Sequence, residues 1–214
     1  MNAPSKRIYV ASRSPGRREL LKQIGVSFEI VLFREDARRG VDVDESPQPG
    51  EDAGEYVLRV ARSKAQAANL RLMQRRLPAY PVLAADTTVV LDQRILGKPA
   101  DETDAIGMLT EMAGRTHQVL TAVAVGRHDR METRLSVSAV DFAPLSATQI
   151  RSYVATGEPL DKAGAYAIQG RAGAFVRHLA GSYTGVMGLP LFETAELLEL
   201  FGLSLPGAHT VERR

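Results

Sequence analysis

One acidic residue stands inside the most apolar stretch of the chain. Asp86 lies within residues 82–91, a run rich in β-branched side chains that predicts a buried strand. A carboxylate in such a place costs several kcal/mol unless it is paired, coordinates a metal or is protonated. We therefore interpret Asp86 as a candidate active-site residue; the alternative is a strand end at which Asp86 faces water. Side chains alternate along a strand, so the predicted neighbours on its face are Val82, Ala84, Thr88 and Val90.

A second group of residues has the composition of a phosphate cradle. The segment from Ser12 to Arg17 follows a predicted strand at residues 8–11 and precedes a predicted helix. Ser14 suits the N-cap of that helix, and Pro15 suits its first position. Backbone N–H groups at a helix start, with Arg13 and Arg17 beside them, favour an anion. The alternative is an ordinary capped helix with solvated arginines, since neither standard glycine-rich nucleotide motif is present.

Other candidate polar residues are ambiguous when taken alone. Lys64 borders the apolar stripe of a predicted helix at residues 53–76, and the local pattern favours a side chain that extends to solvent. Lys98 stands in a constrained Gly-Lys-Pro turn. The acidic residues Asp42, Asp44 and Glu45 belong to a charged loop and favour a solvated interpretation. A lone histidine such as His117 is more often structural than catalytic, and the four histidines have no metal-binding spacing.

The composition is that of an ordinary globular protein, and an α/β fold is the first expectation. We expect a single domain covering residues 1–214, with a frayed tail at 205–214. Two apolar strands joined by a polar connection at 127–134 predict a hairpin, and Ser146 begins a capping box. The remaining predictions are strands at 26–33, 119–126, 135–142 and 174–179, and helices before Gly25, Gly114 and Gly157 and at 191–201.

Composition excludes several kinds of chemistry. The chain has 214 residues, of which 44% are hydrophobic and 24% charged, and it has no cysteine. A thiolate nucleophile, an Fe–S cluster and a cysteine-ligated zinc are therefore excluded. No apolar run is long enough for a membrane span, and the first residues have no signal-peptide pattern. The net charge of +2 gives little support to nucleic-acid binding.

Eight short motifs, in order along nearly the whole chain, together resemble the Maf proteins, a family of nucleoside triphosphate pyrophosphatases associated with septum formation. Each motif is weak alone, but the set is specific and overrides the local interpretations above. The resemblance implies hydrolysis of a nucleoside triphosphate to a monophosphate and pyrophosphate, in a house-cleaning or cell-division role. It also implies a bent mixed sheet with a central cleft, related to inosine-triphosphate pyrophosphatases, a divalent cation (Mg or Mn), a cytoplasmic location and a homodimer. The motifs lie at residues 11–21, 61–65, 85–87, 97–99, 114–117, 161–164, 168–170 and 188–190.

The resemblance also implies roles for single residues. Asp86 matches the catalytic base and would contact the metal, which Glu45 would share. The phosphates would be bound by Ser12, Arg13, Ser14, Arg17, Lys64 and Lys98. Gln169 offers both a donor and an acceptor, which suits the O4 and N3–H edge of thymine or uracil.

Three positions predict which base is selected. In the family branch that acts on dTTP and UTP they are Arg, Thr and Gln; in the branch that acts on 7-methyl-GTP they are an aromatic residue, Gln and Glu. This chain has Gly16, Thr87 and Gln169, so two of the three match the first branch. Gly16 departs from both, and Arg13 could supply the missing guanidinium. The alternatives are a pyrophosphatase for another base, such as 7-methyl-GTP, and a nucleotide- or nucleic-acid-binding regulator of septum formation with little catalysis.

Overall fold

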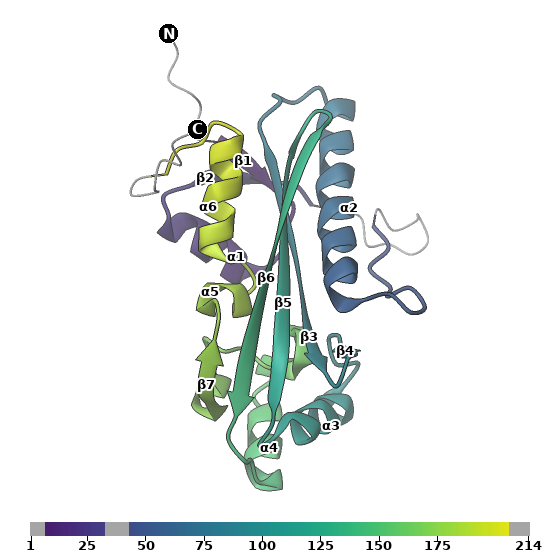
Figure 1. Cartoon of the computed structure of the whole chain (residues 1–214), viewed down its shortest axis with the longest axis vertical. Helices are drawn as coiled ribbons and strands as arrows, with labels where there is room; N and C mark the ends of the chain where they lie inside the picture. Colours follow the sequence, from purple (N-terminus) through teal and green to yellow (C-terminus); the bar gives the residue numbers. More distant parts are fainter. Residues whose placement is uncertain (1–6, 33–42, 206–214) are drawn as a thin grey trace.

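The computed structural model describes residues 7–32 and 43–205 and contains one mixed sheet of seven strands (Figure 1). The strand order is β2-β1-β3-β5-β6-β7, with β4 paired to β3. β1 runs parallel to both β2 and β3, and the other pairs are antiparallel. The strands are β1 (Arg7–Val10), β2 (Ser27–Ile30), β3 (Val82–Leu91), β4 (Arg94–Leu96), β5 (Thr116–Arg127), β6 (Arg130–Phe142) and β7 (Val176–Ala180).

Helices cover the sheet at both ends of an elongated molecule. α2 lies along one side of the long strands, with α1 and α6 on the other side, while α3, α4 and β7 gather at the opposite end (Figure 1). The helices are α1 (Pro15–Gln23), α2 (Ala53–Gln74), α3 (Glu102–Met112), α4 (Ala147–Val154), α5 (Tyr183–Val186) and α6 (Leu191–Leu200). Single 3₁₀ turns lie at Glu158–Asp161, Ala163–Ala165 and Arg171–Phe175.

The core is divided by the two faces of the sheet. One apolar cluster fills the space between α2 and one face, and includes Val82, Ala84 and Val90. A second lies under α1 and α6 on the other face, and includes Leu83 and Ala85. A third is built around α3 and α4 at the far end. Alternate residues of β3 therefore enter different clusters, as expected for a strand buried on both faces.

The edge of β3 is open over its middle. β1 pairs with β3 only at Val82 and Leu83, where the Leu83 carbonyl accepts from Ala11 N–H at 2.8 Å. β4 pairs with β3 only from Val89 onward. Among the described residues, no strand pairs with residues 84–88 on this side, although β5 pairs with them on the other. Asp86 and Thr87 lie in this open stretch, so groups on both faces of the sheet can meet there.

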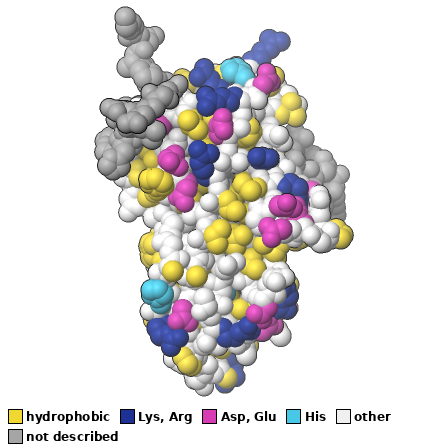
Figure 2. All heavy atoms as spheres, in the orientation of Figure 1, with side chains coloured by type: hydrophobic (Ala, Val, Ile, Leu, Met, Phe, Trp, Pro, Cys, Tyr) yellow, Lys and Arg dark blue, Asp and Glu magenta, His cyan; other side chains and the backbone are white. Residues whose placement is uncertain are grey.

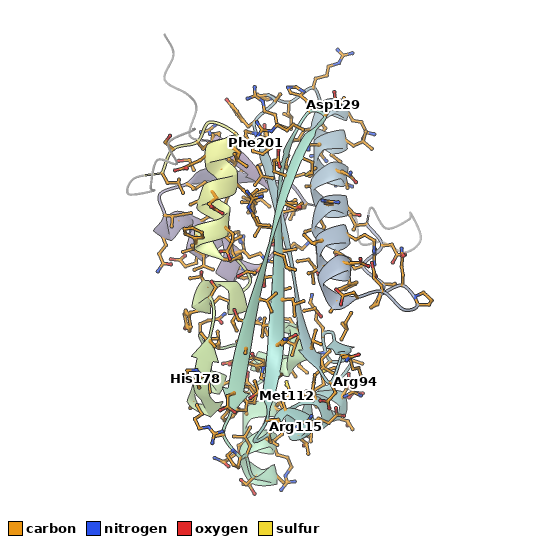
Figure 3. All side chains as sticks on the ribbon, viewed as in Figure 1. Arg94, Met112, Arg115, Asp129, His178 and Phe201 are labelled. Atoms are coloured by element: carbon orange, nitrogen blue, oxygen red, sulfur yellow. The ribbon has the colours of Figure 1, made fainter. Side chains whose placement is uncertain are left out.

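The predicted hairpin was wrong in its boundaries. β5 continues to Arg127 and β6 begins at Arg130, so the connection is a two-residue turn in place of residues 127–134. His128 has φ of 53° there, as tight hairpin turns require. Polar residues after the turn alternate with apolar ones along the first half of β6, which has no strand paired on its outer side among the described residues. Figure 3 shows Asp129 at the tip of the hairpin, and Met112 and Arg115 at the other end of the molecule.

Most other elements agree with the prediction. The buried strand at residues 82–91 is confirmed, and the helix predicted at 53–76 is two residues shorter. Asp101 caps α3, and the capping box of Ser146 is present. β2 and β7 are shorter or shifted relative to 26–33 and 174–179. Phe33, Asp42 and residues 206–214 lie outside the described residues. Within the described residues, no helix combines the length and apolar composition of a membrane span.

Candidate active site

The buried carboxylate of Asp86 is paired with a lysine. Asp86 is 7% exposed, and its Oδ1 lies 2.8 Å from the Nζ of Lys64 on α2. The same Nζ lies 2.8 Å from Oε2 of Glu45, so one ammonium bridges two carboxylates. The local interpretation of Lys64 as a solvent-directed side chain was therefore wrong. Its helix packs on the face of β3 that bears Asp86, and the paired carboxylate offsets the cost of burying the ammonium.

The other face of the open edge carries a guanidinium. Arg17 of α1 donates from Nε to the Gly188 carbonyl at 2.7 Å and from Nη2 to Thr87 Oγ1 at 3.0 Å. Its Nη1 lies 3.5 Å from Ser12 Oγ. Thr87 Oγ1 is also 2.9 Å from Thr121 Oγ1 on β5. Burial lowers the pKa of Arg17, and the negative charges of Asp86 and Glu45 act against that shift. The two faces therefore form one electrostatic unit across the edge of β3.

The loop before α1 is organised by its own serines. Ser12 Oγ accepts from the Ser14 N–H at 3.2 Å, and Ser14 Oγ accepts from the Arg17 N–H at 3.4 Å. Ser14 is therefore the N-cap of α1, as predicted, with Pro15 at the first helical position. Arg13 is exposed, and its carbonyl accepts from Arg18 Nη2 at 3.3 Å. Of the three loop residues Ser12, Arg13 and Ser14, Ser12 alone is buried, and it lies beside the Arg17 guanidinium.

Two of the predicted specificity residues lie beside each other. A Cβ added to Gly16 would stand 3.8 Å from Gln169 Nε2, and every neighbour would be at ordinary contact distance. The exposed amide of Gln169 thus lies near the start of α1, on the same side of the sheet as Arg17 and Thr87. Gly188 has φ of +108°, and a Cβ there would lie 3.4 Å from Arg17 Nε and Thr87 Oγ1. Glycine at position 188 therefore permits both the positive φ of the backbone and the close approach of the Arg17 and Thr87 side chains.

Lys98 is one predicted residue that the structure does not bring into this contact network. It is exposed after β4, and among the described residues no hydrogen bond or ion pair joins it to Asp86 or Arg17. The preceding carbonyl, of Gly97, accepts from Gly164 N–H at 2.9 Å and ties this turn to the segment that leads to Gln169. Its assignment to the site stays a prediction.

The two carboxylates fit a divalent cation as partial ligands. Asp86 Oδ1 and Glu45 Oε2 contact the same nitrogen, so they are no farther apart than twice 2.8 Å. Carboxylate oxygens are the ligands that Mg²⁺ and Mn²⁺ prefer, and Mg²⁺ commonly takes its other ligands from water and phosphate. The described residues contain no cluster of three acidic or histidine side chains with metal-binding geometry. Substrate and solvent would therefore have to complete the coordination.

The sequence analysis missed Tyr56 and Thr121. Tyr56 Oη donates to the Glu45 carbonyl at 2.9 Å, and burial raises its pKa to about 12, with a further contribution from the charges of Asp86 and Glu45. Tyr56 thereby holds the segment that carries Glu45. Thr121 Oγ1 donates to the Gly185 carbonyl at 2.8 Å and faces Thr87. Neither could be found without the strand register and the path of the loop.

His117 lies apart from this group. It is 2% exposed, its Nε2 is 2.9 Å from Tyr166 Oη, and its ring stands edge-on to Phe142 and Tyr166. Burial lowers its pKa to about 4, against a smaller opposite effect of Asp141. A neutral ring inside an aromatic cluster supports the structural interpretation of His117.

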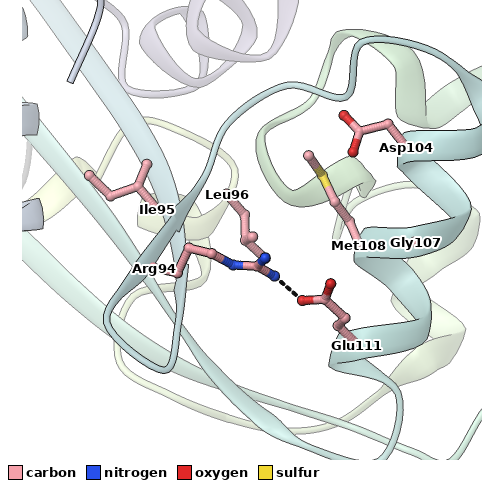
Figure 4. A pocket seen from close by; sticks show the side chains of 7 residues that line it. All are labelled: Arg94, Ile95, Leu96, Asp104, Gly107, Met108 and Glu111. Atoms are coloured by element: carbon pink, nitrogen blue, oxygen red, sulfur yellow. Dashed lines mark hydrogen bonds and ion pairs between the residues drawn. The ribbon is translucent and has the colours of Figure 1, made fainter.

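Two surface pockets lie elsewhere. One, of about 220 Å³, is lined by residues of β4 and α3, with the Arg94–Glu111 ion pair across it (Figure 4). The other, of about 500 Å³, includes Tyr80, Arg127 and Phe201. Asp86 lines neither pocket, so the candidate site is an open edge with converging charges and not one of these hollows.

Comparison with known proteins identifies the family of the chain. A family model described as "Maf-like protein" matches residues 7–201. A protein of Aromatoleum aromaticum named dTTP/UTP pyrophosphatase is 58% identical over 93% of this chain and 97% of its own length. One of the same name from Nitrosomonas europaea is 55% identical over 92% and 96%. Among solved structures, the Staphylococcus aureus Ham1 protein aligns with a TM-score of 0.48 at 18% identity, over 91% of this chain and 97% of that chain.

The family match covers almost all of the described chain, including the β1–α1 loop, the open edge of β3 and the Gly188 turn. The curated relatives align over nearly their full length. This chain belongs to the family of Maf-like proteins.

Proposed function

We propose that this protein is a nucleoside triphosphate pyrophosphatase that hydrolyses dTTP and UTP to the monophosphate and pyrophosphate. The relatives named dTTP/UTP pyrophosphatase support the activity and the substrate class. The observation that carries the proposal is the convergence of Asp86, Lys64 and Arg17 on the open edge of β3. A buried acid beside two cations suits a reaction that activates water next to a polyanion.

The triphosphate would lie across that open edge. Arg17 and the N–H groups at the start of α1 would bind phosphate oxygens, with Ser12 supporting the Arg17 side chain. Lys64 and Lys98 would neutralise further charge. Binding the phosphates in one orientation would hold the α-phosphorus toward Asp86 and the pyrophosphate leaving group toward the cations.

Asp86 would act as the general base. Its Oδ1 accepts from Lys64, which fixes the direction of the carboxylate and leaves Oδ2 to accept a proton from water. The water oxygen then bonds to the α-phosphorus as the bond to the bridging oxygen breaks, and pyrophosphate leaves. Asp86 and Glu45 would hold a Mg²⁺ or Mn²⁺ ion, which supplies charge neutralisation on the phosphates when bound.

Gln169, Thr87 and Gly16 would surround the base. Gln169 would pair with the O4 and N3–H edge of thymine or uracil, and its exposure leaves the amide available. Thr87 holds Arg17 through its hydroxyl and would link phosphate binding to that side of the site. Gly16 leaves the space beside Gln169 unfilled, although its backbone does not require glycine. The protein would act in the cytoplasm as a homodimer, in removal of nucleotides or in a process linked to cell division.

The test is pyrophosphate release over a panel of dTTP, UTP, CTP, ATP, GTP and 7-methyl-GTP with Mg²⁺ or Mn²⁺. We expect dTTP and UTP to have the highest kcat/KM. A preference for 7-methyl-GTP would overturn the substrate assignment, and no release from any nucleotide would overturn the reaction. Gly16→Arg would place a guanidinium beside Gln169, and we expect it to change the ratio of dTTP to 7-methyl-GTP turnover; Gly16→Ala is the matched control.

A further inference from the structure

β6 has an unpaired edge along its first half. It pairs with β5 along nearly its whole length but with β7 only from Ala139 to Phe142. Among the described residues, no strand pairs with residues 130–138 on the outer side. β6 runs between α6 and α2 in Figure 1, and hydrophobic side chains gather near the middle of that face in Figure 2. Leu135 and Val137 of this segment are 36% and 49% exposed.

The odd-numbered residues of this edge direct their backbone groups outward. Phe142 N–H donates to the Arg115 carbonyl before β5, and Ala143 N–H donates to Phe175 on the outer side. Backbone groups alternate along a strand, and the pairing of β6 with β5 continues without a register shift. Met131, Thr133 and Leu135 therefore present N–H and C=O groups at the outer edge. The Thr133 carbonyl accepts from the guanidinium of Arg134 at 3.1 Å, a side-chain donor where a neighbouring strand would otherwise provide one.

This edge has charged side chains at Arg130, Glu132 and Arg134 but lacks other devices that protect a strand from pairing. Residues 130–138 contain no proline and no glycine, and their register with β5 has no bulge. Such an edge is a template for another strand unless something covers it. α2 lies mainly over β3 and β5, and its Arg62 donates from Nη2 to Thr133 Oγ1 at 3.3 Å on one face of β6. The contacts of α6, such as Arg134 with Glu196 at 3.6 Å, come to the other face, so both helices leave the backbone edge uncovered.

We propose that the edge of β6 pairs antiparallel with β6 of a second copy of this chain, about a two-fold axis at Thr133. In that register Glu132 faces Arg134 of the partner subunit, and Met131 faces Leu135 of the partner subunit. Thr133 faces itself across the axis. Opposed residues share a face and interact directly, so the register pairs opposite charges with each other and apolar side chains with each other.

The two registers directly adjacent to it, with the axis at Glu132 or at Arg134, are less favourable. An axis at Glu132 would oppose two carboxylates, and an axis at Arg134 would oppose two guanidinium groups. Like charges directly opposite destabilise a strand pair. The odd residues that meet at Thr133 have outward backbone groups, so each such pair can exchange two N–H···O=C bonds. An interface of this kind is isologous, as two-fold dimers require.

The proposal gives the expected homodimer a defined interface and does not depend on the proposed catalysis. β5 separates β6 from the Asp86 strand, so dimerisation and turnover can be measured independently in the same samples. We therefore expect variants of the β6 edge to lower the molar mass of the protein in solution without abolishing pyrophosphate release. Loss of both properties together would indicate misfolding, which circular dichroism and a thermal melt detect.

The test is the molar mass in solution, from light scattering or sedimentation over a range of concentrations. We expect the full chain to be a dimer. Thr133→Pro removes the N–H at the axis, and we expect at least a tenfold increase in the Kd of dimerisation. This N–H points away from β5, so the pairing within the chain is retained. Thr133→Ala keeps the N–H and is the matched control, expected to stay dimeric.

A charge exchange keeps the proposal testable if the proline variant fails to fold. Glu132→Arg would place two positive side chains opposite each other, and we expect a weaker dimer. Adding Arg134→Glu exchanges the charges across the axis, and we expect it to restore dimerisation. A monomeric wild-type chain at high concentration would overturn the proposal. A dimer that is unchanged in Thr133→Pro and Glu132→Arg, or one that the exchange does not restore, would also overturn it.

Discussion

Two ionisable side chains are buried on neighbouring strands of the sheet, and they are accommodated in opposite ways. Asp86 of β3 is surrounded by charge, since Lys64 contacts it at 2.8 Å and the field of Arg17 reaches it. His117 of β5 is surrounded by aromatic rings, with Tyr166 Oη as its hydrogen-bond partner. Burial alone therefore does not mark a functional residue in this protein.

The two residues differ in what their burial contributes to the stability of the fold. His117 fills a close-packed aromatic cluster as a neutral ring, because burial lowers its pKa to about 4. The Asp86–Lys64–Glu45 group stabilises little beyond offsetting its own desolvation, and it lies where the sheet lacks a neighbouring strand. Convergent charge at an open edge indicates chemistry, whereas a single neutral group in a closed core indicates packing.

The largest expected effect comes from Asp86→Asn. The variant keeps the shape of the side chain but loses the proton acceptor, so we expect turnover of dTTP to fall by roughly 10²- to 10⁴-fold. Lys64 keeps Glu45 as a partner, and we expect the thermal midpoint to change little. Pyrophosphate release and a thermal melt measure the two quantities. Turnover near the wild-type value would remove Asp86 from the mechanism.

The two lysines sharpen the comparison between buried and exposed charge. Lys64→Met would leave the buried Asp86 carboxylate without its ammonium partner, and we expect a loss of about 3 kcal/mol in the free energy of unfolding together with lower turnover. Lys98→Met is the matched control for stability, because Lys98 is exposed, and we expect a change within about 0.5 kcal/mol. Urea denaturation measures both variants. Equal stability of the two variants would contradict the structural role given to Lys64.

At neutral pH the smallest effect is that of His117, because its contribution to stability changes only as the pH falls. Its pKa is about 6.5 when unfolded and about 4 when folded, so the unfolded state binds more protons between these values. Stability from this group is present above pH 6.5 and decreases as the pH falls toward 4, by up to about 3 kcal/mol. His117→Gln cannot titrate and keeps a donor near the position of Nε2. Urea denaturation at pH 7 and pH 4.5 should therefore give a smaller decrease for this variant, and equal decreases would contradict the assignment.

The sequence predicted the parts of the fold that depend on local pattern. The run around Asp86 indicates a buried strand because its residues are β-branched and apolar, and Ser14 and Ser146 indicate helix starts because their caps are local. The two strands of the hairpin were predicted too short, because the polar residues in the first half of β6 resemble a loop in the sequence. Its two-residue turn has no glycine to mark it.

The candidate site could be predicted only from the family motifs taken together, and not from any single residue. The motifs of the family placed Asp86, Lys64, Arg17 and Gln169 together, although the local pattern around Lys64 favoured solvent. The open edge of β3 could not be predicted, because it depends on where β1 and β4 stop pairing. For the same reason the link from Thr87 through Thr121 to Gly185 required the cross-strand register.

The most direct test is a crystal structure of the protein with a non-hydrolysable analogue of dTTP and Mg²⁺. We expect the triphosphate to lie across the open edge of β3, with phosphate oxygens within hydrogen-bonding distance of Arg17 and the α-phosphorus facing Asp86. We also expect the base to contact Gln169. An analogue bound instead in the pocket between α3 and β4, or in the pocket beside Phe201, with Asp86 still paired only to Lys64, would contradict the account.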